Sequence, residues 1–111
     1  DCTAHHKESM KRALFTLATL ALAATGTALA SPDLAKAKNC MGCHTMDKKV
    51  VGPAFKDIAA KYRSSKDATS TLALKIRQGG SGVWGPMAMP ANAQVNEADA
   101  QKLAAWVLSL K

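Results

Sequence analysis

The chain has 111 residues, a length that allows one small domain. Its 15 basic residues outnumber its 8 acidic ones, giving a formal net charge of +7, and only 5% of its residues are aromatic. This length excludes a TIM barrel or a dinucleotide-binding Rossmann domain, both of which need far longer chains. The hydrophobic fraction of 48% argues against global disorder.

The N-terminal part of the chain is typical of an export signal. Met10-Lys11-Arg12 forms a basic start, and residues 13–24 form an apolar run. Ala28-Leu29-Ala30 then matches the small-residue pattern of a cleavage site, so we expect cleavage after Ala30. An uncleaved membrane anchor is the alternative. The stretch from residue 13 to 30 is at the lower edge of spanning length and contains threonines and a glycine, which favours the signal peptide.

Residues 1–9 precede Met10 and form an upstream extension, so Cys2 and His5-His6 within them are given no role. Residues 1–30 are therefore expected to be removed. The predicted mature domain is residues 31–111, located in the periplasm without stable insertion into the membrane. Domains this small often need a cross-link, a metal or a cofactor to be stable.

The predicted domain is all-α, with four short helices and no strand pattern. The helices are expected to start at Ser31, near Phe55, after Asp67 and after Asn96, from capping residues and apolar residues at helical spacing. The segments 39–53 and 79–93 are predicted loops. The apolar faces of these helices are thin for a core, so we expect an apolar group to fill the middle.

The segment from Cys40 to His44 reads Cys-Met-Gly-Cys-His, the attachment signature of c-type haem. The thiols of Cys40 and Cys43 would add across the two haem vinyl groups, and His44 would reach the iron as an axial ligand. A redox disulfide of the thioredoxin kind would need a βαβ pattern that this sequence lacks. Zinc usually needs four ligands, and His44 is the only histidine after residue 30. Export favours haem, because c-type haem is attached outside the cytoplasm.

A second axial ligand must come from a methionine, since no other histidine remains in the predicted domain. Met41 and Met46 lie too close to His44 in the sequence to reach the opposite haem face easily. Met87 and Met89 are the better candidates, because glycine and prolines around them would hold a loop rigidly against the haem. Spacing alone does not separate these two methionines.

Several motifs occur together in an order that resembles small bacterial class I cytochromes c of the c-551/c-552 type. The resemblance covers nearly all of residues 31–111 and rests on Cys-x-x-Cys-His, Val51-Gly52-Pro53-Ala54, Gly82-Val83-Trp84-Gly85-Pro86, Met89-Pro90 with Asn92, and Ala105-Trp106-Val107-Leu108. It implies the cytochrome c fold, with about four short helices wrapped around one covalently bound haem. It also implies that Met89 is the second axial ligand.

The same resemblance implies roles for four further residues. The Pro53 carbonyl would accept a hydrogen bond from the His44 ring nitrogen that is not bound to iron, and Asn92 would hydrogen-bond the methionine region. Trp84 would reach a haem propionate, and Lys75 would neutralise one. Ala91 departs from the family pattern, in which a second proline often follows Pro90.

A haem with histidine and methionine on its two faces has no open site for a substrate, so the sequence predicts a monomeric electron carrier and not an enzyme. The resemblance implies a quinol-oxidising cytochrome complex as donor, and a nitrite reductase of the cytochrome cd type, an oxidase or a peroxidase as acceptor. Lysines 36, 38, 48, 49 and 56 would steer acidic partners to the haem edge.

Nucleic acid is not an expected partner, because the predicted domain has no platform of aromatic and basic residues. Two functions of other classes stay open. A haem peroxidase or gas sensor would require Met89 to dissociate from the iron. A thiol-disulfide oxidoreductase would use a reducible Cys40–Cys43 pair and would carry no haem.

Overall fold

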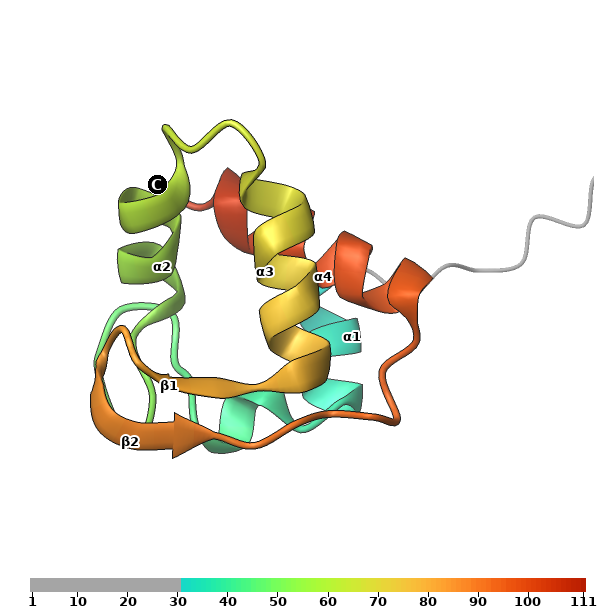
Figure 1. Cartoon of the computed structure of the whole chain (residues 1–111), viewed down its shortest axis with the longest axis horizontal. Coiled ribbons are helices and arrows are strands. Elements are labelled where there is room, and N and C mark those ends of the chain that lie inside the picture. Colours follow the sequence, from blue (N-terminus) through green and yellow to red (C-terminus); the bar gives the residue numbers. More distant parts are fainter. Residues whose placement is uncertain (1–30) are drawn as a thin grey trace, which may run out of the picture.

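The computed structural model describes residues 31–111, and the predicted signal peptide lies outside these described residues. Four α-helices, one short 3₁₀ helix and a two-stranded hairpin follow one another along the chain (Figure 1). Their bounds are Ser31–Ala37 (α1), Cys40–Gly42 (η1), Phe55–Tyr62 (α2), Ala68–Gln78 (α3), Gly80–Gly82 (β1), Gly85–Met89 (β2) and Glu97–Ser109 (α4). The predicted mostly helical fold is confirmed.

The hairpin corrects the prediction that residues 79–93 form a loop without strands. β1 and β2 pair antiparallel, with Gly80 opposite Met89 and Gly82 opposite Gly85. The sequence gives no sign of these strands, because glycine and proline have low strand propensity and the side chains show no apolar–polar alternation. The strands form because the segments on either side of the tight turn at Val83 and Trp84 hydrogen-bond to each other.

The two helix starts predicted from capping residues Asp67 and Asn96 differ in the structure. The side chain of Asn96 accepts a hydrogen bond from the amide of Asp99 at 2.8 Å, which caps α4 as predicted. Asp67 precedes α3 as predicted, but its side chain makes no capping hydrogen bond, since its backbone (φ −110°, ψ 35°) lies outside the extended region.

The core lies where α4 crosses α1 and α3. It consists mainly of alanine and leucine side chains and is formed by Leu34, Ala35, Leu72, Ala73, Val95, Ala100, Leu103 and Ala104. α4 also packs on α2, whereas the hairpin packs mainly on itself. Leu103 and Val95 are the largest side chains that are fully buried, so the packed core is small and lies to one side of the domain.

The segment between η1 and α2 is tied to the first turn of α2. The amides of Phe55 and Lys56 donate to the carbonyls of Thr45 and Met46, at 2.9 and 3.2 Å. These bonds satisfy two of the amides that a helix start leaves without partners. No helix within residues 31–111 has the length and apolar character needed to cross a membrane.

Candidate functional site

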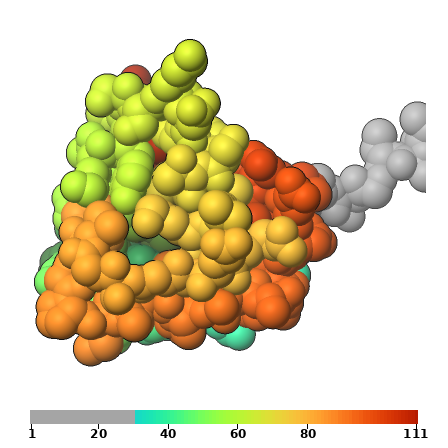
Figure 2. All heavy atoms as spheres, viewed as in Figure 1, coloured from blue at the N-terminus to red at the C-terminus, as the bar shows by residue number. Residues whose placement is uncertain are grey.

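A cavity of about 830 Å³ opens beside the core, between α2, α3 and the hairpin. Figure 2 shows it as a hollow, with α2, α3 and the hairpin around its mouth and earlier parts of the chain at its floor. Its walls include Ile58, Leu72, Leu103 and Trp106, so the inner surface is largely apolar. The volume is within the range of about 300–1,000 Å³ that ligand and cofactor sites occupy.

All eight site residues predicted from the sequence line this cavity. They are Cys40, Cys43, His44, Pro53, Lys75, Trp84, Met89 and Asn92. They come from the η1 turn, the loop after it, the end of α3, the hairpin and the segment before α4. Residues separated by up to half the chain therefore meet around one space.

The two cysteines lie in a tight turn and are not joined by a disulfide. The amides of Cys43 and His44 both donate to the Cys40 carbonyl, at 3.2 and 3.0 Å. Asn39, with φ of 63°, reverses the chain just before this turn. Burial raises the pKa of the Cys40 thiol above its ordinary value. A redox-active disulfide cysteine needs a lowered thiol pKa, so this environment does not favour the hypothesis of a thiol-disulfide oxidoreductase.

His44 is buried, with 8% of its surface exposed. Its Nδ1 donates to the Pro53 carbonyl oxygen at 2.7 Å, which is the contact that the family resemblance implies. Because Nδ1 carries the proton in this bond, Nε2 is left with a lone pair. A hydrogen bond of this kind fixes the ring orientation of a metal-binding histidine and raises its basicity.

Two residues without a predicted site role complete the cradle around His44. A Cβ atom at Gly52 would lie 2.6 Å from the imidazole Cε1, so only glycine leaves room for the ring. The Phe55 ring stacks on the His44 imidazole, with ring centroids 5.1 Å apart, and also meets the Trp106 ring at 5.2 Å. Gly52 belongs to a motif quoted above, but nothing in its spacing shows contact with the imidazole.

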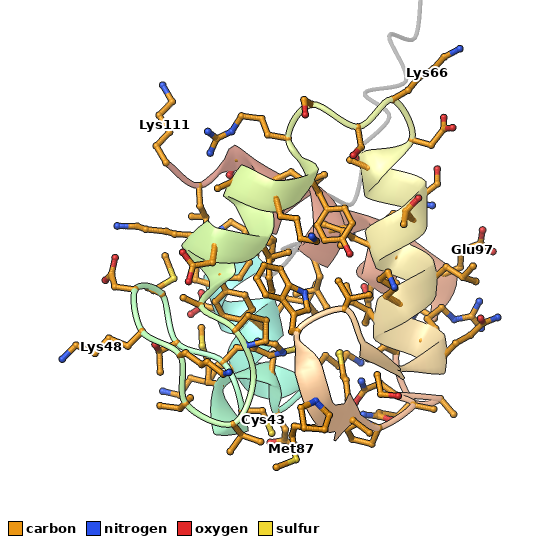
Figure 3. The ribbon with its side chains drawn as sticks, turned by 60° about the vertical axis from the view of Figure 1, so that its left-hand side comes forward. Cys43, Lys48, Lys66, Met87, Glu97 and Lys111 are labelled. Atoms are coloured by element: carbon orange, nitrogen blue, oxygen red, sulfur yellow. The ribbon has the colours of Figure 1, made fainter. Side chains whose placement is uncertain are left out.

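Burial separates the two candidate methionines. Met87 is 65% exposed, whereas Met89 is half-buried, although both line the cavity. In Figure 3, Met87 and Cys43 both appear at the lower end of the molecule. Met89 is the last residue of β2 and is paired with Gly80 in the hairpin. The structure therefore offers a more enclosed sulfur at position 89.

The segment after Met89 is anchored to the end of α3. The Asn92 side-chain amide donates to the carbonyls of Ile76 and Pro90, at 2.9 and 3.2 Å, and its backbone amide donates to Arg77. Gly79 has φ of +70°, and a Cβ there would collide with the Met89 carbonyl. Asn92 and Gly79 thus fix the backbone that carries Met89.

The charges around the cavity suit a cofactor that bears carboxylates. Lys49 and Lys75 lie on the lining, which includes no Asp or Glu among the residues the structure describes. The ammonium of Lys61 lies 5.5 Å from the centroid of the Trp84 ring at the mouth. An apolar cavity with two thiols, one buried imidazole, one enclosed thioether and two cations has the donor set that a covalently attached haem needs.

Two of the five lysines predicted to attract acidic partners already form ion pairs within the chain. Lys38 lies 3.5 Å from Asp99, and Lys56 lies 2.6 Å from Asp47. Of the five lysines, Lys49 is the one that lines the cavity. Zinc finds no site here, because no three His, Cys, Asp or Glu side chains gather around a point in residues 31–111.

The family model for cytochrome c matches residues 28–111. The chain belongs to the cytochrome c family. It is 55% identical over 98 residues to cytochrome c-552 of Nitrosomonas europaea, covering 88% of this chain and 95% of the relative. It is 50% identical to cytochrome c-551 of Pseudomonas aeruginosa over 101 residues, covering 85% of this chain and 96% of the relative.

Solved structures agree with this assignment. The crystal structure of wild-type Nitrosomonas europaea cytochrome c552 matches with a TM-score of 0.71 and 57% identity, covering 72% of this chain and 99% of that one. The class 1 cytochrome MtoD of Sideroxydans lithotrophicus matches with a TM-score of 0.60 and 29% identity, covering 73% and 92%. The predicted resemblance to class I cytochromes c-551/c-552 is confirmed.

As a cytochrome c, the chain binds covalently attached haem c, and the Cys40, Cys43 and His44 of its Cys-x-x-Cys-His turn all line the cavity. It is a haem-based electron carrier, and its relatives are electron-transfer proteins and not enzymes. The cavity also explains the small core, since this cytochrome c builds its apolar interior around the cofactor.

Proposed function

We propose that this cytochrome c carries single electrons in the periplasm through a haem held by His44 and Met89. The observation that carries the proposal is the placement of these two side chains on one apolar cavity that also contains Cys40 and Cys43. Cys40 and Cys43 would form the thioether links. Bound in this cavity, haem c supplies an Fe(II)/Fe(III) couple that accepts and gives up one electron.

The chain's own residues would set the properties of that couple. The Pro53 carbonyl holds the proton of His44 at Nδ1, which leaves Nε2 for the iron and keeps the ring from turning. The thioether of Met89 is a soft ligand that favours Fe(II) and raises the potential. The apolar walls act in the same direction, because they disfavour the additional charge of the oxidised state.

The polar groups at the mouth would orient and enclose the cofactor. Lys75, in the last turn of α3, lines the cavity and would offset a propionate charge. Trp84 also lines the cavity, and its indole N–H is a donor for a carboxylate. Asn92 holds the segment after Met89 against α3. With His44 and Met89 both holding the iron, the chain would leave no place for a substrate there.

The export signal supports a location, the resemblance to c-551/c-552 cytochromes implies redox partners, and the charge suits acidic ones. We propose that the signal peptide is cleaved after Ala30 and that the domain acts as a monomer. Its donor would be a quinol-oxidising cytochrome complex, and its acceptor a nitrite reductase of the cd type, an oxidase or a peroxidase. Lys49 at the cavity, with Lys36 and Lys48, would attract acidic partners through a small and weak interface.

The first test is a visible spectrum of the protein matured in the periplasm, oxidised and reduced, with and without carbon monoxide. Sharp bands of a covalently bound low-spin haem that carbon monoxide leaves unchanged would support the proposal. Bands that shift with carbon monoxide would indicate an open site and a peroxidase or sensor. A colourless protein would contradict haem binding. The mass of the mature protein shows whether cleavage follows Ala30.

The ligand assignment needs a matched pair of variants. Met89→Ala is expected to abolish the methionine-to-iron absorption band and to allow carbon monoxide to bind the reduced protein. Met87→Ala removes the same side chain two residues earlier and is expected to leave both properties unchanged. The opposite result would assign the sixth position to Met87.

A further inference from the structure

The hairpin that carries Met89 is held at its base by a dense set of contacts. The base lies at the end of α3, where the Gly79 backbone passes close to the Met89 carbonyl and the Asn92 side chain donates to the carbonyls of Ile76 and Pro90. Gly82 pairs with Gly85, so the tip at Val83 and Trp84 follows directly on the paired strands, with a register irregularity between Gly80 and Gly82. Met89 lies at the end of β2 opposite the tip, so a displacement of the tip acts on the strand that carries Met89.

The tip has far weaker support. Val83 is 46% exposed and Trp84 is 37% exposed, so neither side chain is buried in the domain. The tip lies next to α2 at the cavity mouth (Figure 1), yet α2 packs mainly on α4. Within residues 31–111, no ion pair joins the tip to α2.

One contact joins the hairpin tip to α2. Lys61, in the last turn of α2, places its ammonium 5.5 Å from the centroid of the Trp84 ring. This distance is within the range of about 6 Å at which a cation and an indole face attract each other. Trp84 also lines the cavity, so the contact joins a lining residue of the hairpin to α2.

We propose that Lys61 is a positioning residue: by holding the Trp84 ring, it latches the hairpin tip to α2 and so restrains β2 and Met89. This proposal rests on the proposed ligation of the iron by Met89. When the latch opens, the chain holds the hairpin only at its base, and the proposed contacts of Trp84 and Met89 with the haem are left to hold its outer part. Met89 would then leave the iron more often. A small neutral molecule then competes more easily for that position.

The test uses the haem-loaded protein and three variants. Lys61→Gln removes the cation, Lys61→Arg keeps it, and Lys66→Gln makes the same charge change in the turn between α2 and α3. In Figure 3, Lys66 projects from the end of the molecule opposite Met87 and Cys43. Two properties are measured: the affinity of the oxidised protein for neutral imidazole, and the solvent exchange of the Trp84 indole N–H by NMR.

Loss of one exposed cation–π contact corresponds to a change of about two- to fivefold in an opening equilibrium. Lys61→Gln is therefore expected to raise imidazole affinity and Trp84 exchange by about that factor, whereas Lys61→Arg restores both. Lys66→Gln is expected to match the wild type. The indole N–H of Trp106, the other tryptophan of the chain, is the internal control and should not change.

Three results would overturn the proposal. Lys61→Gln could behave like Lys66→Gln, Lys61→Arg could fail to restore the wild-type values, or Trp84 exchange could rise without a change in imidazole affinity. Failure of the proposed ligation looks different. In that case Met89→Ala would bind imidazole no better than the wild type, while the exchange of Trp84 would still report whether Lys61 holds the ring.

Discussion

The rings of His44 and Phe55 stack with their centroids 5.1 Å apart and their planes inclined by 25°. Phe55 also meets the edge of Trp106 at 5.2 Å and is only 4% exposed. The first residue of α2 thereby joins the haem-attachment turn to α4. The histidine orientation depends on this packing as well as on its hydrogen bond to Pro53.

Replacing Phe55 by leucine should test that packing. The variant Phe55→Leu keeps an apolar side chain but loses two aromatic pairs, each worth about 0.5–1.5 kcal/mol. We expect the free energy of unfolding of the haem-loaded protein to fall by about 1–3 kcal/mol in guanidinium titrations. Leu74→Ala, at a site 52% exposed, should change it by less than about 0.5 kcal/mol. Equal stabilities for the two variants would show that the stacking contributes little.

Because Gly52 lies close to His44, adding a single methyl group at this position should disturb the protein more than adding one at Gly42. In Gly52→Ala, the added Cβ would lie 2.6 Å from the imidazole, which must shift. We expect a loss of about 1–3 kcal/mol in stability and a perturbed low-spin spectrum. Gly42→Ala, also in the attachment region but with no chain atom within 4 Å of its new Cβ, should change neither. A normal spectrum for Gly52→Ala would contradict this prediction, because it would show that the loop moves and leaves the imidazole in place.

Asn92 and Gln94 offer a contrast between a structural and a surface amide. Asn92→Ala removes the donor to the Ile76 and Pro90 carbonyls, and two such bonds are worth about 1–3 kcal/mol together. Its unfolding midpoint should drop, and its methionine-to-iron band should weaken. Gln94→Ala removes only the exposed bond to Asn92 Oδ1 and should stay within about 0.5 kcal/mol of the wild type. Similar losses for both variants would place the stabilisation in the surface network instead.

The position of Lys49 predicts a local electrostatic effect on electron exchange. Lys49→Gln removes a cation from the cavity lining, whereas Lys66→Gln makes the same net change at a distant site. For a singly charged anion at about 10 Å, the lost attraction in water is about 0.4 kcal/mol, or about twofold in rate. Stopped-flow oxidation by a small anionic iron complex should show this loss at low salt, and added salt should erase it. Equal oxidation rates for the two variants would show that the rate depends on the net charge of the protein and not on the position of Lys49.

Local sequence signals account for the helices and for the position of the site. Asn96 before an apolar stripe marks the start of α4, and its capping bond forms as predicted. The Cys-x-x-Cys-His turn locates the attachment point because its chemistry needs that spacing. The ligand choice between Met87 and Met89 could not be made from spacing, since both lie on one short strand. Their different burial only becomes visible once the hairpin is folded.

Contacts between distant segments explain what the sequence did not reveal. β1 and β2 exist through their pairing, and their glycine-rich sequences carry no strand pattern. The contact of Gly52 with His44 depends on how the loop folds back, which no local motif describes. The pairing of Lys38 with Asp99 joins the turn after α1 to α4, so a cluster of lysines in sequence does not translate into a ring of unpaired charges.

Gly79 ends α3 and at the same residue supports the carbonyl of Met89, so the hairpin is a closed loop whose length is fixed at both ends. One inserted or deleted residue between them would carry the methionine away from its place. The turn between α2 and α3 does not position a proposed ligand, and surface turns of that kind tolerate changes in length. Over evolutionary time, we therefore expect length variation to accumulate in that turn and to be eliminated from the hairpin.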